Sequence, residues 1–163
     1  MTKKIKILLI IGAIIVFIIA VLAWIVFPID IYKLNGDSMS PTYSNGDQLT
    51  VNKYAPLTRG SIIIFNSTIP DKNQLLINVK RIIGLPNELL TISNCKVSIN
   101  NQELNLKELM PNTTACISGE INLKIPENEY FVIGDNPAQS LDSRILGAIK
   151  KADIIGVVHG KLK

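Results

Sequence analysis

The chain is 163 residues long, enough for one modest globular domain together with one membrane segment. Its 17 basic residues exceed its 13 acidic residues, which gives a formal net charge of +4. Lys3, Lys4 and Lys6 precede every acidic residue, so the remainder of the chain is nearly neutral. Such a domain lacks the basic stripe of a nucleic-acid-binding protein, and we expect no nucleic-acid partner.

Residues 7–27 form an uncharged stretch rich in Ile, Val and Leu. A helix of this length spans about 30 Å, the thickness of the hydrocarbon core of a lipid bilayer. A cleaved signal peptide is the alternative, but its apolar core is usually only about 7–15 residues long. The three lysines before the stretch favour a cytoplasmic N-terminus. We therefore expect a single-pass protein of the cytoplasmic membrane: residues 1–6 in the cytoplasm, 7–27 in the lipid bilayer, and 28–163 as an extracytoplasmic domain.

Beyond the apolar stretch, short apolar runs alternate with turn signals. Residues 66–73 predict an exposed loop, 100–101 a tight turn and 106–109 a short helical turn. We expect strands at residues 29–34, 48–51, 62–65, 75–83, 89–92, 96–99, 121–125, 130–133 and 154–158. This spacing is typical of an all-β domain, either a partly open barrel or a sandwich.

Cys95 and Cys116 are the two cysteines of the chain. In an extracytoplasmic domain an even number of cysteines favours a disulfide, although two buried free thiols are the alternative. A metal site is not expected, because His159 is the only histidine and is far from both cysteines in sequence.

Ser38 lies in the turn sequence GDSMSPT, about ten residues beyond the apolar stretch. A serine nucleophile without a well-placed histidine needs another base, and a lysine can serve if its amine is neutral. Lys80 stands in a predicted strand whose same-face neighbours are Asn78 and Ile82. Burial and the nearby charge of Arg81 would both lower its pKa, whereas in the alternative the amine simply reaches water.

Four stretches, taken together, resemble the type I signal peptidases, which are membrane-anchored serine endopeptidases. They are residues 36–42, Arg59-Gly60, residues 79–88, and Gly134-Asp135-Asn136 followed by Ser140, Asp142, Ser143 and Arg144. The resemblance implies a hydrolase that removes N-terminal signal peptides from exported precursor proteins after Ala-x-Ala-like sites, without a cofactor. The small size of the chain is similar to that of the conjugative-transfer pilin-processing subgroup.

The resemblance also implies roles for individual residues. Ser38 would be the nucleophile and its backbone N–H one oxyanion donor, Lys80 the general base, and Ser140 the group that orients the lysine. The substrate would contact Met39, Asn78 and Val79, while Gly134, Asp135, Asp142 and Arg144 would support the site. Gly36 has no side chain where some members carry a serine hydroxyl, so a water or a backbone group must supply the second donor. Ser61, Asn87 and Pro137 also differ from the usual family residues.

Three alternatives stay open at the level of the sequence. Within the family, a pilin-maturing peptidase could resolve the acyl-enzyme with an amine instead of water. A non-enzymatic pilus or secretion-complex subunit would explain the anchor and the cysteines but not the serine turn. A self-cleaving repressor shares serine-lysine chemistry, but the apolar stretch and the lack of a DNA-binding helical segment argue against it.

Overall fold

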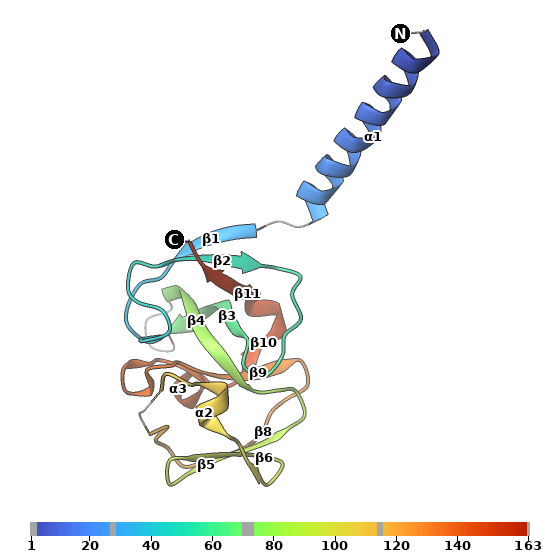
Figure 1. Cartoon of the computed structure of the whole chain (residues 1–163). Coiled ribbons are helices and arrows are strands. Elements are labelled where there is room, and N and C mark those ends of the chain that lie inside the picture. Colours follow the sequence, from blue (N-terminus) through green and yellow to red (C-terminus); the bar gives the residue numbers. More distant parts are fainter. Residues whose placement is uncertain (1–2, 27–28, 70–73, 114–115, 163) are drawn as a thin grey trace.

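The computed structural model describes residues 3–26, 29–69, 74–113 and 116–162. The helix α1 (Lys3–Val26) begins four residues before the predicted apolar segment, because lysine is a good helix former and continues the helix into the charged flank. Within the described residues, α1 is the one helix that is long and apolar enough to cross a membrane. It lies apart from the β-domain, and its candidate span Lys3–Val21 packs against nothing else (Figure 1).

The larger of the two sheets has the strand order β1-β2-β11-β3-β4-β9-β10, and its pairs are antiparallel. Its strands are β1 (Ile29–Lys33), β2 (Gln48–Asn52), β3 (Ile62–Ile69), β4 (Gln74–Gly84), β9 (Glu129–Ile133), β10 (Ile149–Lys150) and β11 (Ile154–Lys161). Three short helices lie in its connections: η1 (Pro137–Gln139), α3 (Ser143–Leu146) and η2 (Lys151–Asp153).

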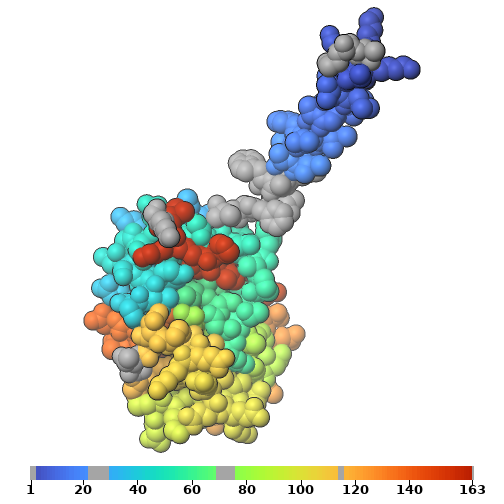
Figure 2. Space-filling view, viewed as in Figure 1, coloured from blue at the N-terminus to red at the C-terminus, as the bar shows by residue number. Residues whose placement is uncertain are grey.

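The smaller sheet lies at the end of the β-domain away from α1 and has the order β7-β6-β5-β8 (Figures 1 and 2). It contains β5 (Leu89–Ser93), β6 (Lys96–Ile99), β7 (Gln102–Glu103) and β8 (Ile121–Lys124), with the helical turn α2 (Leu106–Leu109) beside it. The turn at Asn100 and Asn101 has positive φ angles of 51° and 67°, which asparagine tolerates well. A disulfide joins Cys95 to Cys116 in this part of the molecule.

The predicted all-β fold with one N-terminal apolar helix is confirmed, and the described strands form open sheets rather than a closed barrel. The prediction of an exposed loop at residues 66–73 is wrong in part. Residues 66–69 continue β3, because each of them pairs with a residue of β4, ending at Ile69 opposite Gln74. The rest of that expected loop, residues 70–73, lies outside the described residues. The two-residue strands β7 and β10 were not predicted, since they are too short to show any period.

Strand β3 carries the core on both of its faces. Ile62 and Ile64 pack into one apolar cluster with Leu34 and Met39, whereas Ile63 and Phe65 pack into a second cluster on the opposite face. This alternation explains the continuous apolar run, which predicted a strand buried on both sides. A third cluster lies between the small sheet and the adjoining part of the large one. The large sheet thus supports the turn around Met39, which packs on one face of β3.

Candidate active site

Ser38 lies in the loop between β1 and β2, where several backbone hydrogen bonds hold the chain. Its carbonyl oxygen accepts a hydrogen bond from the backbone N–H of Asn136, at 2.9 Å. Gly36 adopts a φ of +88°, and its N–H donates to Oδ1 of Asn45 at 3.0 Å. Met39 is fully buried beneath the turn. The turn therefore presents the Ser38 hydroxyl from a fixed backbone.

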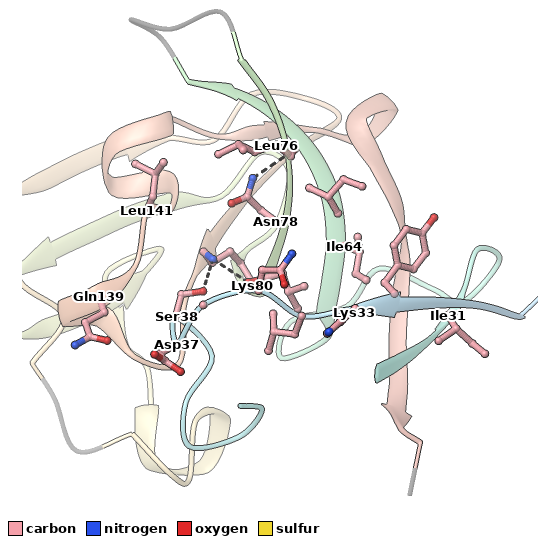
Figure 3. A pocket seen from close by; sticks show the side chains of 16 residues that line it. Ile31, Lys33, Asp37, Ser38, Ile64, Leu76, Asn78, Lys80, Gln139 and Leu141 are labelled. Carbon is pink, nitrogen blue, oxygen red and sulfur yellow. Dashed lines mark hydrogen bonds between the residues drawn. The ribbon is translucent and has the colours of Figure 1, made fainter. Parts of the chain in front are cut away.

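Lys80 approaches Ser38 from the middle of β4. Its Nζ atom donates hydrogen bonds to Oγ of Ser38 at 2.7 Å and to the carbonyl oxygen of Val79 at 3.0 Å (Figure 3). The side chain is only 3% exposed, so the sequence alternative in which the amine reaches bulk water is wrong. The two residues are 42 positions apart in sequence, and the antiparallel packing of the large sheet brings them into contact.

Burial lowers the pKa of Lys80 from its ordinary value of 10.5 to about 8, while the negative charge of Asp142 opposes the shift. The expected contribution of Arg81 is absent. Arg81 points to the other side of β4, where its Nε donates to Asp135 at 2.8 Å, and this ion pair neutralises its charge. Desolvation therefore makes the neutral amine the major form above about pH 8, well below the ordinary pKa of 10.5.

The segment after β9 packs directly against the serine turn. A Cβ atom placed on Gly134 would lie 2.5 Å from the Ser38 carbonyl oxygen and would collide with Oγ of Ser140, so no side chain fits there. Asp135 is buried and accepts hydrogen bonds from both Arg81 and the Thr42 hydroxyl, the latter at 2.5 Å. These contacts join the serine turn, β4 and the segment that begins at Gly134.

Asp142 and Arg144 form an ion pair, with Arg144 Nε 2.8 Å from Oδ1 of Asp142. The second oxygen of Asp142 accepts the backbone N–H of Gly134 at 3.1 Å. Arg144 also donates to the carbonyl oxygen of Pro137 at 2.6 Å. The pair thereby fixes the path of the chain between Gly134 and α3. Ser140 lies within this connecting segment.

Ser140 does not form the hydrogen bond to Lys80 that the resemblance implies. Its Oγ atom is the one buried side-chain polar atom in the described residues that has no hydrogen-bond partner. The hydroxyl lies against Gly134, close to the serine turn. Its role in orienting the lysine therefore stays a prediction.

A pocket of about 650 Å³ opens beside Ser38 and Lys80. Its walls come from β1 and the following turn, from β4, and from Gln139 and Leu141 (Figure 3). The part of β4 before Arg81 pairs with β3 on one edge, and no other described strand covers its second edge. β1 is likewise the outermost strand of its sheet. The pocket is therefore bordered by two strand edges with free backbone groups.

Of the three residues expected to contact substrate, Asn78 and Val79 line this pocket, whereas Met39 does not. Met39 packs in the same cluster as Leu34, Ile64 and Val79, behind the pocket wall. Gln139 and Leu141 were not predicted to line the pocket, because their positions depend on the path of the chain after β9. Asn136 belongs to the motif Gly134-Asp135-Asn136, but nothing in the sequence signals the hydrogen bond from its N–H to the Ser38 carbonyl oxygen.

The other candidates lie outside this site. His159 is exposed on β11, and the disulfide belongs to the small sheet. The residues for which the structure gives positions contain no group of three or more His, Cys, Asp or Glu side chains arranged to hold a metal ion.

The sequence matches the family described as signal peptidase, peptidase S26, over residues 6–162. It is 35% identical to signal peptidase I P of Bacillus subtilis subsp. natto, over 95% of this chain and 88% of that protein. It is 34% identical to signal peptidase I V of Bacillus subtilis (strain 168), over 78% of this chain and 82% of that protein. A crystal structure of a signal peptidase I from Enterococcus faecalis V583 is 31% identical, with a TM-score of 0.48, and covers 67% of this chain and 98% of that one.

Proposed function

This chain belongs to the signal peptidase family, peptidase S26, and from that membership we propose that it cleaves exported precursor proteins with a Ser38–Lys80 dyad. The 2.7 Å contact between Lys80 Nζ and Ser38 Oγ is the observation that supports this mechanism most strongly. The sequence identity to these relatives identifies the protein as a signal peptidase I-like hydrolase. The proposal therefore concerns which residues perform the reaction.

Ser38 Oγ attacks the carbonyl carbon of the scissile peptide bond, and the neutral Lys80 amine accepts the hydroxyl proton as the new C–O bond forms. The resulting ammonium then gives this proton to the leaving nitrogen as the C–N bond breaks. Water hydrolyses the acyl-enzyme in a second step that uses Lys80 as base again. The backbone N–H of Ser38 stabilises the oxyanion, and a further donor is still needed, since Gly36 has no side chain.

The precursor binds in this proposal as an extended segment in the pocket between β1 and β4. Both strands have free edges there, so main-chain hydrogen bonds can extend the sheet while alternate side chains enter the pocket. Val79 and Leu34 give an apolar surface beside the nucleophile. This arrangement agrees with small residues at positions −3 and −1, the Ala-x-Ala-like pattern that the family resemblance implies.

The helix α1 is proposed to anchor the enzyme in the cytoplasmic membrane, with its lysine-rich end in the cytoplasm. Signal peptidases are membrane-associated, and α1 has the length and composition of a membrane span. β1 begins three residues after α1 ends, so Ser38 lies close in sequence to the end of the anchor. Anchoring would confine enzyme and precursor to one surface and raise their effective concentration.

The proposal is tested by cleavage of a precursor with Ala at −3 and −1, using the full chain in detergent. We expect wild type to release the mature protein, while Ser38→Ala and Lys80→Met each lose at least about 1,000-fold in kcat/KM. Thr91→Ala, a change at a half-buried position of the small sheet that does not line the pocket, serves as the matched control and should keep wild-type activity. Full activity in Lys80→Met would show that another group is the base.

The sequence alternatives gain no support from the comparisons. The relatives described above are named signal peptidase I, which favours neither a pilin-maturing peptidase nor a non-enzymatic subunit. The same assay shows whether water or an amine accepts the acyl group. With water the released acyl fragment carries a free carboxylate, whereas with an amine it is joined to that amine by a new amide bond.

A further inference from the structure

Asn78 interrupts an otherwise apolar wall of the active-site pocket. The β4 residues that line the pocket before Lys80 are Leu76, Ile77, Asn78 and Val79, and only Asn78 carries a polar side chain. Asn78 is half-buried, and it lies on the same side of β4 as Lys80 (Figure 3). A polar group in this position meets the substrate rather than the core.

The amide of Asn78 has a fixed orientation. Its Nδ2 atom donates to Oγ of Ser67 at 2.7 Å and reaches the carbonyl oxygen of Leu76 at 3.4 Å. A carbonyl can only accept a hydrogen bond, so the nitrogen has to face Leu76 and the amide oxygen has to face the other way. Figure 3 shows the nitrogen turned toward Leu76 and the oxygen on the opposite side.

The amide oxygen of Asn78 has no donor among the residues that the structure describes, since both hydrogen bonds of this side chain are made by its nitrogen. It is also not a buried orphan, because Ser140 Oγ is the one such atom in that part of the chain. An accessible acceptor with free lone pairs therefore faces the pocket. A bound segment that covered it with an apolar group would leave it unsatisfied, at a cost in binding.

The register of β4 indicates which substrate side chain meets this oxygen. Asn78 precedes Lys80 by two residues and shares its face of the strand, about 7 Å away. In an extended substrate, the side chain two residues from the cleaved residue lies on the same face as the −1 side chain. When the bound segment runs parallel to β4 with its −1 residue at Ser38, this side chain belongs to the −3 residue of the Ala-x-Ala-like pattern.

We propose that Asn78 is a specificity-determining residue whose amide oxygen accepts a hydrogen bond from a hydroxyl-bearing side chain at position −3 of the precursor. The enzyme then cleaves precursors with Ser or Thr at −3 more efficiently than precursors with an apolar residue of equal size. This inference rests on the proposed Ser38–Lys80 site. It deepens that proposal by naming the class of precursor that the pocket selects.

The test compares precursors that are identical except for Thr or Val at −3, because these side chains have the same shape and differ by one hydroxyl group. For wild type in detergent we expect kcat/KM for Thr to exceed that for Val by about 3- to 10-fold, the range of one net hydrogen bond. Asn78→Leu should lower the ratio to about one or below, whereas Asn78→Asp keeps an acceptor oxygen and should keep the preference for Thr. Thr and Val at −2, where the side chain faces away, should give a ratio near one in all three enzymes.

A wild-type ratio of one or less, or an unchanged ratio in Asn78→Leu, would overturn the inference. Each variant is its own reference for the ratio, so a general loss of activity in Asn78→Leu does not disturb the comparison. A precursor with Ala at −3 distinguishes a failure of the proposed Ser38–Lys80 mechanism from a failure of the proposed role of Asn78. If Ser38→Ala still cleaves it, the proposed mechanism is wrong and this inference falls with it; if only the Thr preference is missing, the dyad stands and Asn78 has no selective role.

Discussion

Lys80 shows how one buried amine links stability to function. Its pKa in the folded protein is about 8, below the ordinary 10.5, because burial disfavours the ammonium form. Between these two values the unfolded chain binds more protons than the folded one, so stability rises with pH from about 8 to about 10.5. Below pH 8 the amine is charged in both states, and the folded protein carries the whole cost of burying it.

Replacing Lys80 by methionine should therefore stabilise the fold while abolishing activity. At pH 7 we expect Lys80→Met to raise the free energy of unfolding by on the order of 1–3 kcal/mol, with the difference from wild type shrinking above pH 8. Denaturant unfolding followed by circular dichroism across this pH range measures both quantities. A variant that is less stable than wild type at pH 7 would show that burial of the Lys80 ammonium does not destabilise the fold.

Gly134 tests the close contact between the serine turn and the segment after β9. In Gly134→Ala the new methyl group would lie 2.5 Å from the Ser38 carbonyl oxygen, so the turn or the segment must move. We expect activity to fall at least about 100-fold, because a displacement of about 1 Å is enough for that loss. Gly160→Ala is the control, since no atom lies within 4 Å of its added Cβ, and it should keep activity. Equal activity in the two variants would refute the contact.

At the level of elements, the sequence predicted the strands that have strong apolar patterns and missed those that depend on partners. The run 62–65 became the first half of β3, which is buried on two faces, and the run 75–83 became β4, which is buried mainly from Val79 onward. Residues 66–68 are polar and are followed by a single apolar residue, Ile69, yet all four form a strand because β4 offers its backbone as a partner. Local patterns contain no information about such pairing.

The disulfide between Cys95 and Cys116 lies close in sequence to a residue that contacts the active-site support. Thr113, three residues before Cys116, donates its hydroxyl to the carbonyl oxygen of Asp135 at 2.6 Å. The disulfide links residues 21 positions apart, and this cross-link restricts the conformations of the unfolded chain. Asp135 also forms the ion pair with Arg81, so the hydroxyl of Thr113 contacts a residue of the active-site support.

We expect the double variant Cys95→Ser/Cys116→Ser to lose about 3 kcal/mol of stability, as the chain-entropy estimate gives for a loop of this length. Unfolding midpoints of wild type with and without reductant, compared with those of the variant, measure the loss. The variant should not respond to reductant. Wild type that unfolds at the same denaturant concentration in both redox states would contradict the expectation.

For the whole molecule, the resemblance noted in four short motifs is confirmed by the family match, which spans almost the entire chain. Their mutual placement could not be predicted. The pairing of β4 with β3 and β9 sets the position of Lys80, while the bond from Asn136 to the Ser38 carbonyl sets the position of the nucleophile. The contacts with β9 and Asn136 are distant in sequence, so only the folded sheet brings the dyad together.

The proposed membrane orientation makes a prediction at the same scale. A protease added outside intact cells stripped of their wall should digest residues of the β-domain but spare an epitope placed before Lys3. Replacing Lys3, Lys4 and Lys6 by glutamate should reduce the fraction of chains in this orientation, because positive residues set it. An epitope that is digested in wild type while the β-domain survives would reverse the proposed orientation.

The most direct measurement of the Ser38–Lys80 mechanism is the pH dependence of kcat/KM for precursor cleavage. Only the neutral amine can accept the Ser38 proton, so we expect activity to rise with pH along a single ionisation near pH 8 and to level off above it. A rise centred near pH 6, or a rate that does not change from pH 6 to 10, would contradict a buried lysine as the catalytic base.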